Sequence, residues 1–398
     1  MRKIEEKLYT PVKYECDVLV AGGGVAGIAS AMAAAREGAR VILTERMFML
    51  GGLATAGLVT IYLPLCDGEG RQVSFGIAEE LLRLSIEHGD EGRYPEEWLD
   101  DNDYEKRRAG KRFEVQFNPH LFAISAERVL RELGVTILYG ATVVSVNEYK
   151  GRITDVVIES KSGREAISVK KCAVDCTGDA DLCQLSSAET ATFGVGNTLA
   201  AWYYYTAPEG HKLKMHGFAD VGPNSIRSLN GKRYTGLDTC EISDMMIDSH
   251  GEIEKDILKR RAEGEDIFPT CIASIPQLRK TRRLIGDYVM DYAEEHKYFE
   301  DSVGMVSNWK KRGPVYEIPF GTLRTAKVKN LLVAGRCISV TDDLWEITRV
   351  IPDCAVTGEA AGTAAAMTDN LDTLSVKALQ DRLVSRGVVL HEKDLGSV

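Results

Sequence analysis

The chain has 398 residues, of which 44% are hydrophobic and 27% are charged, a composition typical of a folded globular protein. A chain of this length can bury a large core, which excludes an intrinsically disordered chain and a small disulfide-stapled scaffold. The net charge of −10 leaves no evident basic surface, so we expect no nucleic-acid partner.

The cysteines and the apolar segments indicate the compartment. Nine cysteines are present, an odd number, and no two of them show Cys-x-x-Cys spacing. This pattern disfavours a disulfide framework and a zinc site, and it is typical of a reducing compartment. Glycines interrupt the first apolar stretch, residues 18–35, so it matches neither a signal peptide nor a membrane span. We therefore expect a cytoplasmic protein with no metal site and no membrane contact.

The first elements of the chain form a βαβ unit. Residues 16–21 predict a buried strand, residues 25–37 predict an alanine-rich helix, and residues 40–44 predict a second strand. Units of this kind build parallel sheets. The helix begins at Val25 and Ala26, where unpaired N–H groups and the helix dipole favour a phosphate group.

The turn between the first strand and the helix carries the motif Gly22-x-Gly24-x-x-Gly27. The first glycine permits the sharp turn, the second lets a pyrophosphate approach the backbone, and the third allows close packing of helix and strand. Glu45 ends the second strand, where its carboxylate can accept hydrogen bonds from ribose hydroxyls. The motif predicts a dinucleotide site but does not distinguish FAD from NAD.

The following segments predict helices and a β-meander. Residues 75–86 have the periodicity of an amphipathic helix, and Asn118-Pro119 is typical of the start of a second helix. A strand over residues 135–138 comes next. Residues 143–174 then contain alternating or apolar segments broken by two tight turns, which predict a three-stranded meander.

The pattern changes in residues 186–327, where aromatic strand-like runs alternate with loops and one charged helix near residues 253–263. This alternation predicts a mixed α+β region. The α/β pattern returns with a strand over residues 330–334 and helices over residues 353–368 and 375–386.

We therefore predict an α/β protein in two parts. A Rossmann-like nucleotide-binding domain, with a parallel sheet and the meander, is built from residues 1–60, 115–185 and 328–398. The insertions between these pieces, residues 61–114 and 186–327, would form a mixed α+β lobe over the substrate.

Four segments favour FAD over NAD because they extend the predicted site beyond an ADP moiety. In chain order they are Arg46 with Gly52, Leu53 and Thr55, then Thr177, Gly178 and Asp179, then Gly335 and Arg336, and finally Gly358 and Ala361 at a second helix start. A helix start can offer backbone N–H groups to the edge of a ligand. Each segment alone is explained by packing, but their combination and order are not.

Together these motifs resemble the FAD-dependent oxidoreductases of the glutathione-reductase-like type, and more narrowly the broad bacterial family of FAD-dependent oxidoreductases. Further resembling segments are Asp175 to Asp181, Arg282-Arg283 with Tyr288, Tyr316 to Pro319 and Asn330 to Arg336. The resemblance therefore covers almost the whole chain. Its motifs are specific for FAD but not for one reaction.

The resemblance implies a role for each cofactor motif. The glycine loop would hold the pyrophosphate, Glu45 would bind the adenosine ribose, and the backbone near Val143 would contact the adenine. Gly52 to Thr55 and the helix start at Gly358 would flank the isoalloxazine ring. A helix N-terminus near the flavin would stabilise negative charge on the reduced ring.

Two further features of the sequence narrow the prediction. The chain contains no second complete Gly-x-Gly-x-x-Gly motif, and no pair of cysteines follows Gly51-Gly52. We therefore expect neither a separate NAD(P)H domain nor a redox disulfide facing the flavin.

Three residues are candidates for catalysis. Arg349 precedes the helix expected to face the flavin, and it would bind an anionic or polar substrate group or stabilise developing charge. Arg283 and Tyr288 are the other two candidates. An alternative for Arg283 and its neighbour Arg282 is a salt bridge between the lobe and the domain.

The predicted function is a two-electron oxidoreductase with non-covalent FAD, in which a hydride passes between a small polar substrate and the flavin. An unidentified external electron acceptor or donor would complete the cycle. Alternatives are a dehydrogenase that binds NAD in the first βαβ unit and a flavin-binding electron-transfer component without turnover. Symmetric enzymes are commonly dimers, so we expect a homodimer.

Overall fold

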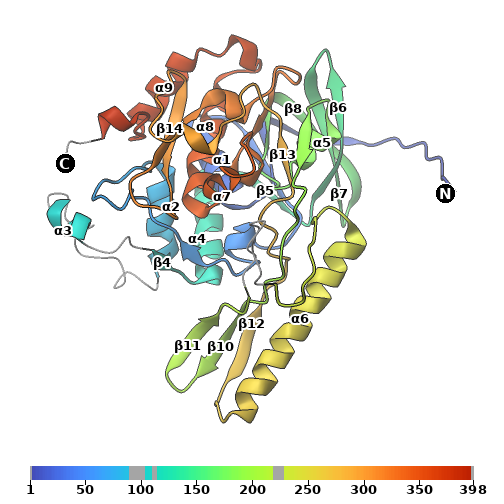
Figure 1. The fold of residues 1–398 in the computed structure, drawn as a ribbon. Coiled ribbons are helices and arrows are strands. Elements are labelled where there is room, and N and C mark those ends of the chain that lie inside the picture. The colour runs from blue at the N-terminus through green and yellow to red at the C-terminus, as the bar shows by residue number, and fades with distance from the viewer. Residues whose placement is uncertain (1, 89–103, 110–113, 218–227, 396–398) are drawn as a thin grey trace.

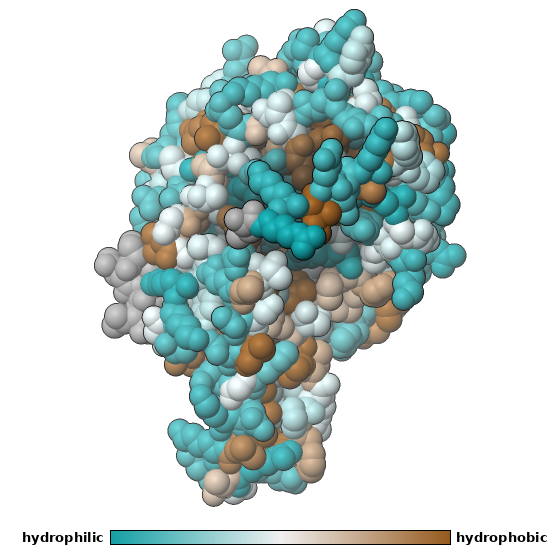
Figure 2. All heavy atoms as spheres, turned by 90° about the vertical axis from the view of Figure 1, so that its right-hand side faces the viewer, coloured by the Kyte–Doolittle hydropathy of each residue, from teal (hydrophilic) through white to brown (hydrophobic). Residues whose placement is uncertain are grey.

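The computed structural model describes residues 2–88, 104–109, 114–217 and 228–395. A large sheet and its helices form the main body, and a narrower arm projects from it, as Figures 1 and 2 show from two directions. Parts of the two segments predicted for the lobe, residues 89–103, 110–113 and 218–227, lie outside the described residues.

The central sheet of the described chain has seven strands in the order β5-β2-β1-β8-β7-β6, with β16 also paired to β8. The strands are β1 (Val12–Ala21), β2 (Val41–Glu45), β5 (Thr136–Tyr139), β6 (Thr142–Tyr149), β7 (Arg152–Ser160), β8 (Gly163–Asp175) and β16 (Leu331–Val333). The pairs β1–β2, β1–β8, β2–β5 and β8–β16 are parallel, whereas β6–β7 and β7–β8 are antiparallel. The predicted parallel sheet and three-stranded meander are confirmed.

The α-helices of the described residues are α1 (Val25–Arg36), α2 (Ile77–Ile86), α3 (Tyr104–Ala109), α4 (Pro119–Glu132), α5 (Asp181–Leu185), α6 (Thr239–Ala262), α7 (Trp345–Thr348), α8 (Ile351–Met367) and α9 (Val376–Ser385). Asn118 caps α4, because its side chain accepts hydrogen bonds from the N–H groups of His120 and Leu121. The predicted amphipathic, Asn118-capped and C-terminal helices are confirmed as α2, α4 and α9. Within the described ranges, no helix combines the length and apolar character needed to cross a bilayer.

Helices α1 and α8 pack closely against each other through glycine. A Cβ atom added to Gly362 would lie 2.1 Å from the backbone oxygen of Ser30, and one added to Gly358 would lie 2.5 Å from that of Ala26. Only glycine permits such an approach. Helix α8 begins at Ile351, so the predicted helix start at Gly358 is wrong. The small residues that suggested a helix start are small because they pack against α1.

The arm consists of the antiparallel sheet β11-β10-β12 and the long helix α6 (Figure 1). Its strands are β10 (Tyr203–Ala207), β11 (Gly210–Lys214) and β12 (Phe268–Ile272). Tyr203 on the sheet packs with Ile253 and Ile257 on α6. Helix α6 begins at Thr239, so the helix predicted near residues 253–263 covers only its C-terminal half. The N-terminal half of α6 is rich in Thr, Ser and Asp. Because these residues have low helix propensity, the sequence pattern did not indicate a helix there.

Short antiparallel pairs complete the strands of the described residues. They are β3 (Ile61–Tyr62) with β4 (Val115–Gln116), β9 (Thr190–Thr192) with β13 (Arg282–Leu284), and β14 (Ser302–Ser307) with β15 (Val315–Pro319). The main hydrophobic core joins the central sheet to Leu82, Phe193, Val303 and Tyr316, all from segments predicted for the lobe. These segments therefore contribute to the same core, and the division into a domain and a lobe stays a prediction.

Candidate functional site

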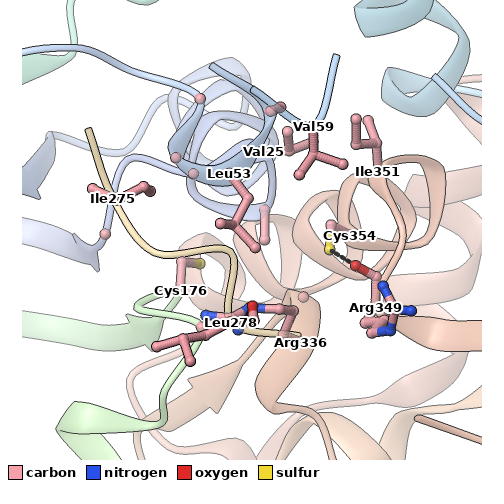
Figure 3. A pocket seen from close by; sticks show the side chains of 18 of the residues that line it. Val25, Leu53, Val59, Cys176, Ile275, Leu278, Arg336, Arg349, Ile351 and Cys354 are labelled. Carbon is pink, nitrogen blue, oxygen red and sulfur yellow. Dashed lines mark hydrogen bonds between the residues drawn. The ribbon is translucent and has the colours of Figure 1, made fainter. Parts of the chain in front are cut away.

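A cavity of about 600 Å³ opens where β1, β2, β8 and β16 end (Figure 3). Gly22, Glu45, Cys176 and Ala334, which end or directly follow these four strands, line it. In open α/β sheets, ligands bind at the carboxyl ends of the parallel strands. The volume lies within the range of small-molecule sites, so this cavity is the candidate active site.

The three glycines of the predicted loop have different surroundings. Gly22 has a φ of 97°, and a Cβ there would lie 2.5 Å from the backbone oxygen of Cys176. A Cβ on Gly27 would lie 1.8 Å from the backbone oxygen of Gly22, so Gly27 serves packing and does not line the cavity. Gly24 lines the cavity, and a Cβ there would meet nothing within 4 Å. The loop therefore exposes its backbone to a ligand at Gly24.

The carboxylate of Glu45 is held on the cavity wall by backbone donors. Its Oε2 accepts a hydrogen bond from the N–H of Gly23, and its Oε1 accepts one from the N–H of Met47, both at 2.7 Å. Glu45 is only 7% exposed. Each oxygen keeps acceptor capacity for a further donor, such as a ribose hydroxyl. Arg46, the next residue, also lines the cavity.

The second glycine segment is attached to the first. The N–H of Gly51 donates to the backbone oxygen of Gly23 at 2.8 Å, which places Gly52 and Leu53 on the cavity wall. Thr55 does not line the cavity. Its hydroxyl donates a hydrogen bond to the backbone oxygen of Leu50 and so stabilises the turn over residues 50–55.

The segment after β8 meets the segment after β16 through an ion pair. Asp179 lies 3.0 Å from Nη2 of Arg336, and it also accepts a hydrogen bond from the hydroxyl of Thr281. Gly178 has a φ of 79°, and a Cβ there would lie 2.6 Å from Arg336. Gly178 lines the cavity, and so do three other residues that the sequence predicted for the cofactor site, namely Val143, Thr177 and Gly335.

The start of α8 lines the cavity through Val350, Ile351 and Cys354, not through Gly358 and Ala361. Both of the latter are buried inside α8. The unpaired N–H groups of this helix lie at Ile351, which is therefore where α8 can meet a ligand. Burial raises the pKa of the Cys354 thiol to about 12, so it is a neutral thiol near neutral pH.

Of the three predicted catalytic residues, only Arg349 lines the cavity. Arg283 lies 3.6 Å from Asp342 and stacks over Trp345, outside the cavity wall. The hydroxyl of Tyr288 donates to Glu294, and its ring packs against Phe299.

The salt-bridge alternative describes the arginines better than a catalytic role does. Nη2 of Arg282 lies 2.8 Å from Asp181, and its Nε donates to the backbone oxygen of Asp179. Arg282 thereby attaches β13 to the segment after β8. Arg283 forms the ion pair with Asp342 instead, and neither arginine lines the cavity.

The sequence prediction missed a group of lining residues from loops, from β3 and from α7. They are Val59, Ile61, Leu63, Glu114, Trp202, Met215, Ile275, Pro276, Leu278, Arg279, Trp309, Lys310 and Glu346. Figure 3 shows Ile275, Leu278 and Val59 among them, with side chains on different walls. No motif spacing marks these residues, because they converge from segments far apart in the chain.

The lining residues fit FAD. The open backbone at Gly24 and the N-terminus of α1 suit a pyrophosphate, and the carboxylate of Glu45 suits a ribose. Gly52, Leu53 and the start of α8 extend the same cavity beyond the nucleotide motif. A second binding region of this kind suits the flavin half of FAD.

The chain is similar to several known proteins. The chain is 33% identical to a thioredoxin reductase of Ureaplasma parvum serovar 3 over 70 residues. These residues are 18% of this chain and 23% of the reductase. Similar solved structures include the OxyS anhydrotetracycline hydroxylase of Streptomyces rimosus (13% identity, TM-score 0.44, covering 93% of this chain and 65% of that chain). Another is a geranylgeranyl bacteriochlorophyll reductase-like protein of Thermoplasma acidophilum (12% identity, TM-score 0.43, covering 95% and 93%).

A family model also matches this chain. The chain spans about a quarter of the thioredoxin reductase and about two thirds of the hydroxylase. The family model described as FAD dependent oxidoreductase matches residues 17–201 and 207–383, which is most of this chain. The protein therefore belongs to the FAD dependent oxidoreductase family.

Proposed function

We propose that this FAD-dependent oxidoreductase transfers a hydride between a small polar organic substrate and non-covalently bound FAD, and that an external acceptor or donor completes the cycle. One observation supports this proposal: a single cavity is lined by Gly24 and Glu45 of the nucleotide motif and by Arg349 beside α8. Bound FAD supplies the two-electron chemistry, whereas the chain binds and orients the reactants.

The residues that line the cavity divide between the two halves of FAD in this proposal. Gly22, Gly24 and the start of α1 hold the pyrophosphate, Glu45 binds the ribose, and Val143 contacts the adenine. The flavin half is flanked by two groups of lining residues, namely Gly52 and Leu53, and Gly335 and Arg336.

The start of α8 and Arg349 perform the remaining tasks. The N-terminus of a long helix carries a partial positive charge, which at Ile351 stabilises negative charge on the reduced flavin. Arg349 precedes this helix and binds a polar group of the substrate. When the flavin is held at α8 and the substrate is held by Arg349, the reacting carbon is oriented toward the flavin. This lowers the entropic part of the activation barrier.

The visible absorption spectrum of the purified protein tests the cofactor and its attachment. We expect a flavin band that moves to the supernatant after heat denaturation, with the mass of FAD. An anaerobic screen for compounds that bleach the band then tests hydride transfer. Flavin that stays with the precipitate would contradict non-covalent binding. A colourless protein that is stabilised by NAD but not by FAD would contradict the whole proposal.

A further inference from the structure

Four cations lie at or near the cavity wall, and three of them surround one carboxylate. This cationic cluster consists of Arg279, Lys280, Lys310 and Arg349 with Glu346. The carboxylate of Glu346 lies 2.9 Å from Arg349, 3.0 Å from Lys280 and 3.2 Å from Lys310. Burial raises the pKa of Glu346, but the three cations outweigh burial and hold that pKa below its usual range. The carboxylate is therefore ionised, and one negative charge faces three positive charges.

Arg279 adds a fourth positive charge to the cavity wall. Within the described part of the chain it forms no ion pair, its Nη2 donates to Oε1 of Gln277 at 2.8 Å, and its guanidinium lies 5.7 Å from the ring centre of Trp202. Burial and then the positive charge of Arg349 lower the pKa of Arg279, yet a guanidinium stays protonated. Arg279 and Arg349 both line the cavity.

Neighbouring carboxylates do not neutralise this charge. Asp342 is half exposed, does not line the cavity and faces Arg283 at 3.6 Å. Glu114 lines the cavity, but it is exposed and its charge is screened by water. Asp179 is paired with Arg336. The cationic cluster therefore retains excess positive charge that a bound anion would neutralise.

Arg349 also has an unused donor. Its side chain is 10% exposed, and its Nε is buried without a hydrogen-bond partner among the described residues. A buried donor without an acceptor costs free energy. Figure 3 shows Arg349 on the cavity wall across from Val59 and Ile351. The excess positive charge points to an anionic group at this wall.

The rest of the wall near the cluster is apolar. The indole N–H of Trp202 donates to the backbone oxygen of Gly217, and that of Trp309 donates to the backbone oxygen of Glu346. Both polar groups are therefore already used, so the indoles offer a ligand apolar surface. Leu278, the neighbour of Arg279 in the chain, also lines the cavity. A ligand at this wall would combine an anion with an apolar body.

We infer that the substrate carries a carboxylate beside an apolar or aromatic body, and that Arg279 and Arg349 bind this carboxylate. The inference rests on the proposed function and specifies its substrate class. Arginine forks match the two oxygens of a carboxylate. Arginine also binds phosphate, but Pro352 removes one N–H from the first turn of α8, so this wall offers a phosphate fewer backbone donors than the glycine loop does.

Binding of matched acids and amides to the flavin-loaded protein tests this inference. The probes are benzoate, phenylacetate and indole-3-acetate, their amides, and phenyl phosphate, measured by equilibrium dialysis and by flavin difference spectra. We expect at least one acid to bind about tenfold or more tightly than its amide, because only the acid gains the charge-assisted hydrogen bonds. Phenyl phosphate should bind more weakly than this acid.

Four variants separate charge recognition from structural damage. Arg279→Met and Arg349→Met should each weaken acid binding about tenfold or more and weaken amide binding much less, because the amide lacks the charge of the acid. Glu346→Gln removes the competing carboxylate and should tighten acid binding. Lys311→Met is the matched control, because Lys311 adjoins Lys310 but lies over the ring of Tyr292 and does not line the cavity. If Arg349→Met fails to fold, Arg279→Met carries the test.

The outcomes distinguish this inference from the proposed function. The inference is overturned if no acid binds to the yellow protein, if amides bind as tightly as acids, if phenyl phosphate binds best, or if the arginine variants leave acid binding unchanged. A protein without flavin contradicts the proposed function instead. Arginine-dependent acid binding without bleaching by any carboxylate substrate would retain the anion site and contradict hydride transfer.

Discussion

At the scale of single residues, the nucleotide motif combines packing and binding in neighbouring positions. Gly22 and Gly27 are required because a Cβ would collide with backbone, whereas Gly24 leaves open space over the cavity. Glu45 accepts two backbone hydrogen bonds and still faces the cavity. One carboxylate thus fixes the loop and presents acceptors to a ribose.

Glu45→Ala should weaken FAD binding about tenfold or more, because the ribose hydroxyls and the N–H groups of Gly23 and Met47 lose their acceptor. The measurement is the FAD dissociation constant of flavin-stripped protein by fluorescence quenching. Glu15→Ala is the control, since Glu15 pairs with Arg40 and Lys170 and does not line the cavity. Equal affinity in wild type and Glu45→Ala would contradict a role for Glu45 in the site.

At the scale of elements, the contact between α1 and α8 decides where the cavity ends. Gly358 and Gly362 bring the backbones together, which places the start of α8 beside the carboxyl ends of β1 and β16. Glycine weakens an isolated helix by about 1 kcal/mol relative to alanine. The glycines of α8 are therefore explained by the close approach, not by helix formation.

The same substitution should have opposite effects in α8 and α6. Gly362→Ala should destabilise the protein by about 1–3 kcal/mol, because its Cβ would lie 2.1 Å from the backbone oxygen of Ser30. Gly251→Ala should stabilise it by about 0.5–1 kcal/mol, because Gly251 lies inside α6 with nothing within 4 Å of an added Cβ. Urea unfolding of the flavin-loaded proteins measures both. Equal shifts would contradict the close contact.

At the scale of the whole molecule, a buried carboxylate connects α8 to α2. Oε2 of Glu359 accepts a hydrogen bond from the N–H of Ile77 at 2.8 Å. Burial raises the pKa of Glu359 from 4.5 to about 7, despite this hydrogen bond and the nearby Arg36 and Arg386, and Glu80 adds to the increase. The folded protein therefore holds a proton that the unfolded chain releases at lower pH.

This pKa predicts a pH dependence of stability. Between about pH 4.5 and about pH 7 the folded state binds the extra proton, so the contribution of Glu359 falls as pH rises and is constant above that range. Wild type should lose more unfolding free energy between about pH 5 and about pH 8 than Glu359→Gln, by on the order of 3 kcal/mol. Urea unfolding at both pH values measures the difference. The same pH dependence in both proteins would refute the assignment.

FAD should stabilise the whole fold because its cavity is built from segments of the entire chain. A ligand that binds only the folded state at a hundredfold excess over its dissociation constant stabilises it by about 2.7 kcal/mol. We expect the melting temperature of flavin-stripped protein to rise on adding FAD and to stay unchanged on adding NAD. A larger rise with NAD would contradict the FAD site.

Local pattern alone predicted the βαβ unit, the meander and the residues of the nucleotide motif. These features depend on neighbours in the chain, namely Gly22 to Gly27 between a strand and a helix and the two tight turns within residues 143–174. Arg349 was also predicted, because it precedes a recognisable helix. Its companions Arg279 and Glu346 were not, because nothing in their local sequence marks them.

The sequence by itself determined the order of most elements, the cofactor class and fifteen of the forty residues that line the cavity. Only the tertiary structure decided that α8 begins at Ile351, that Gly358 packs against α1, and that Arg283 and Tyr288 lie outside the cavity. It alone brought Lys310 and Arg349 to the carboxylate of Glu346 and Arg279 to the wall of the same cavity. The physical reason is that local propensity acts over a few residues, whereas charge and packing act between segments that meet only in the folded chain.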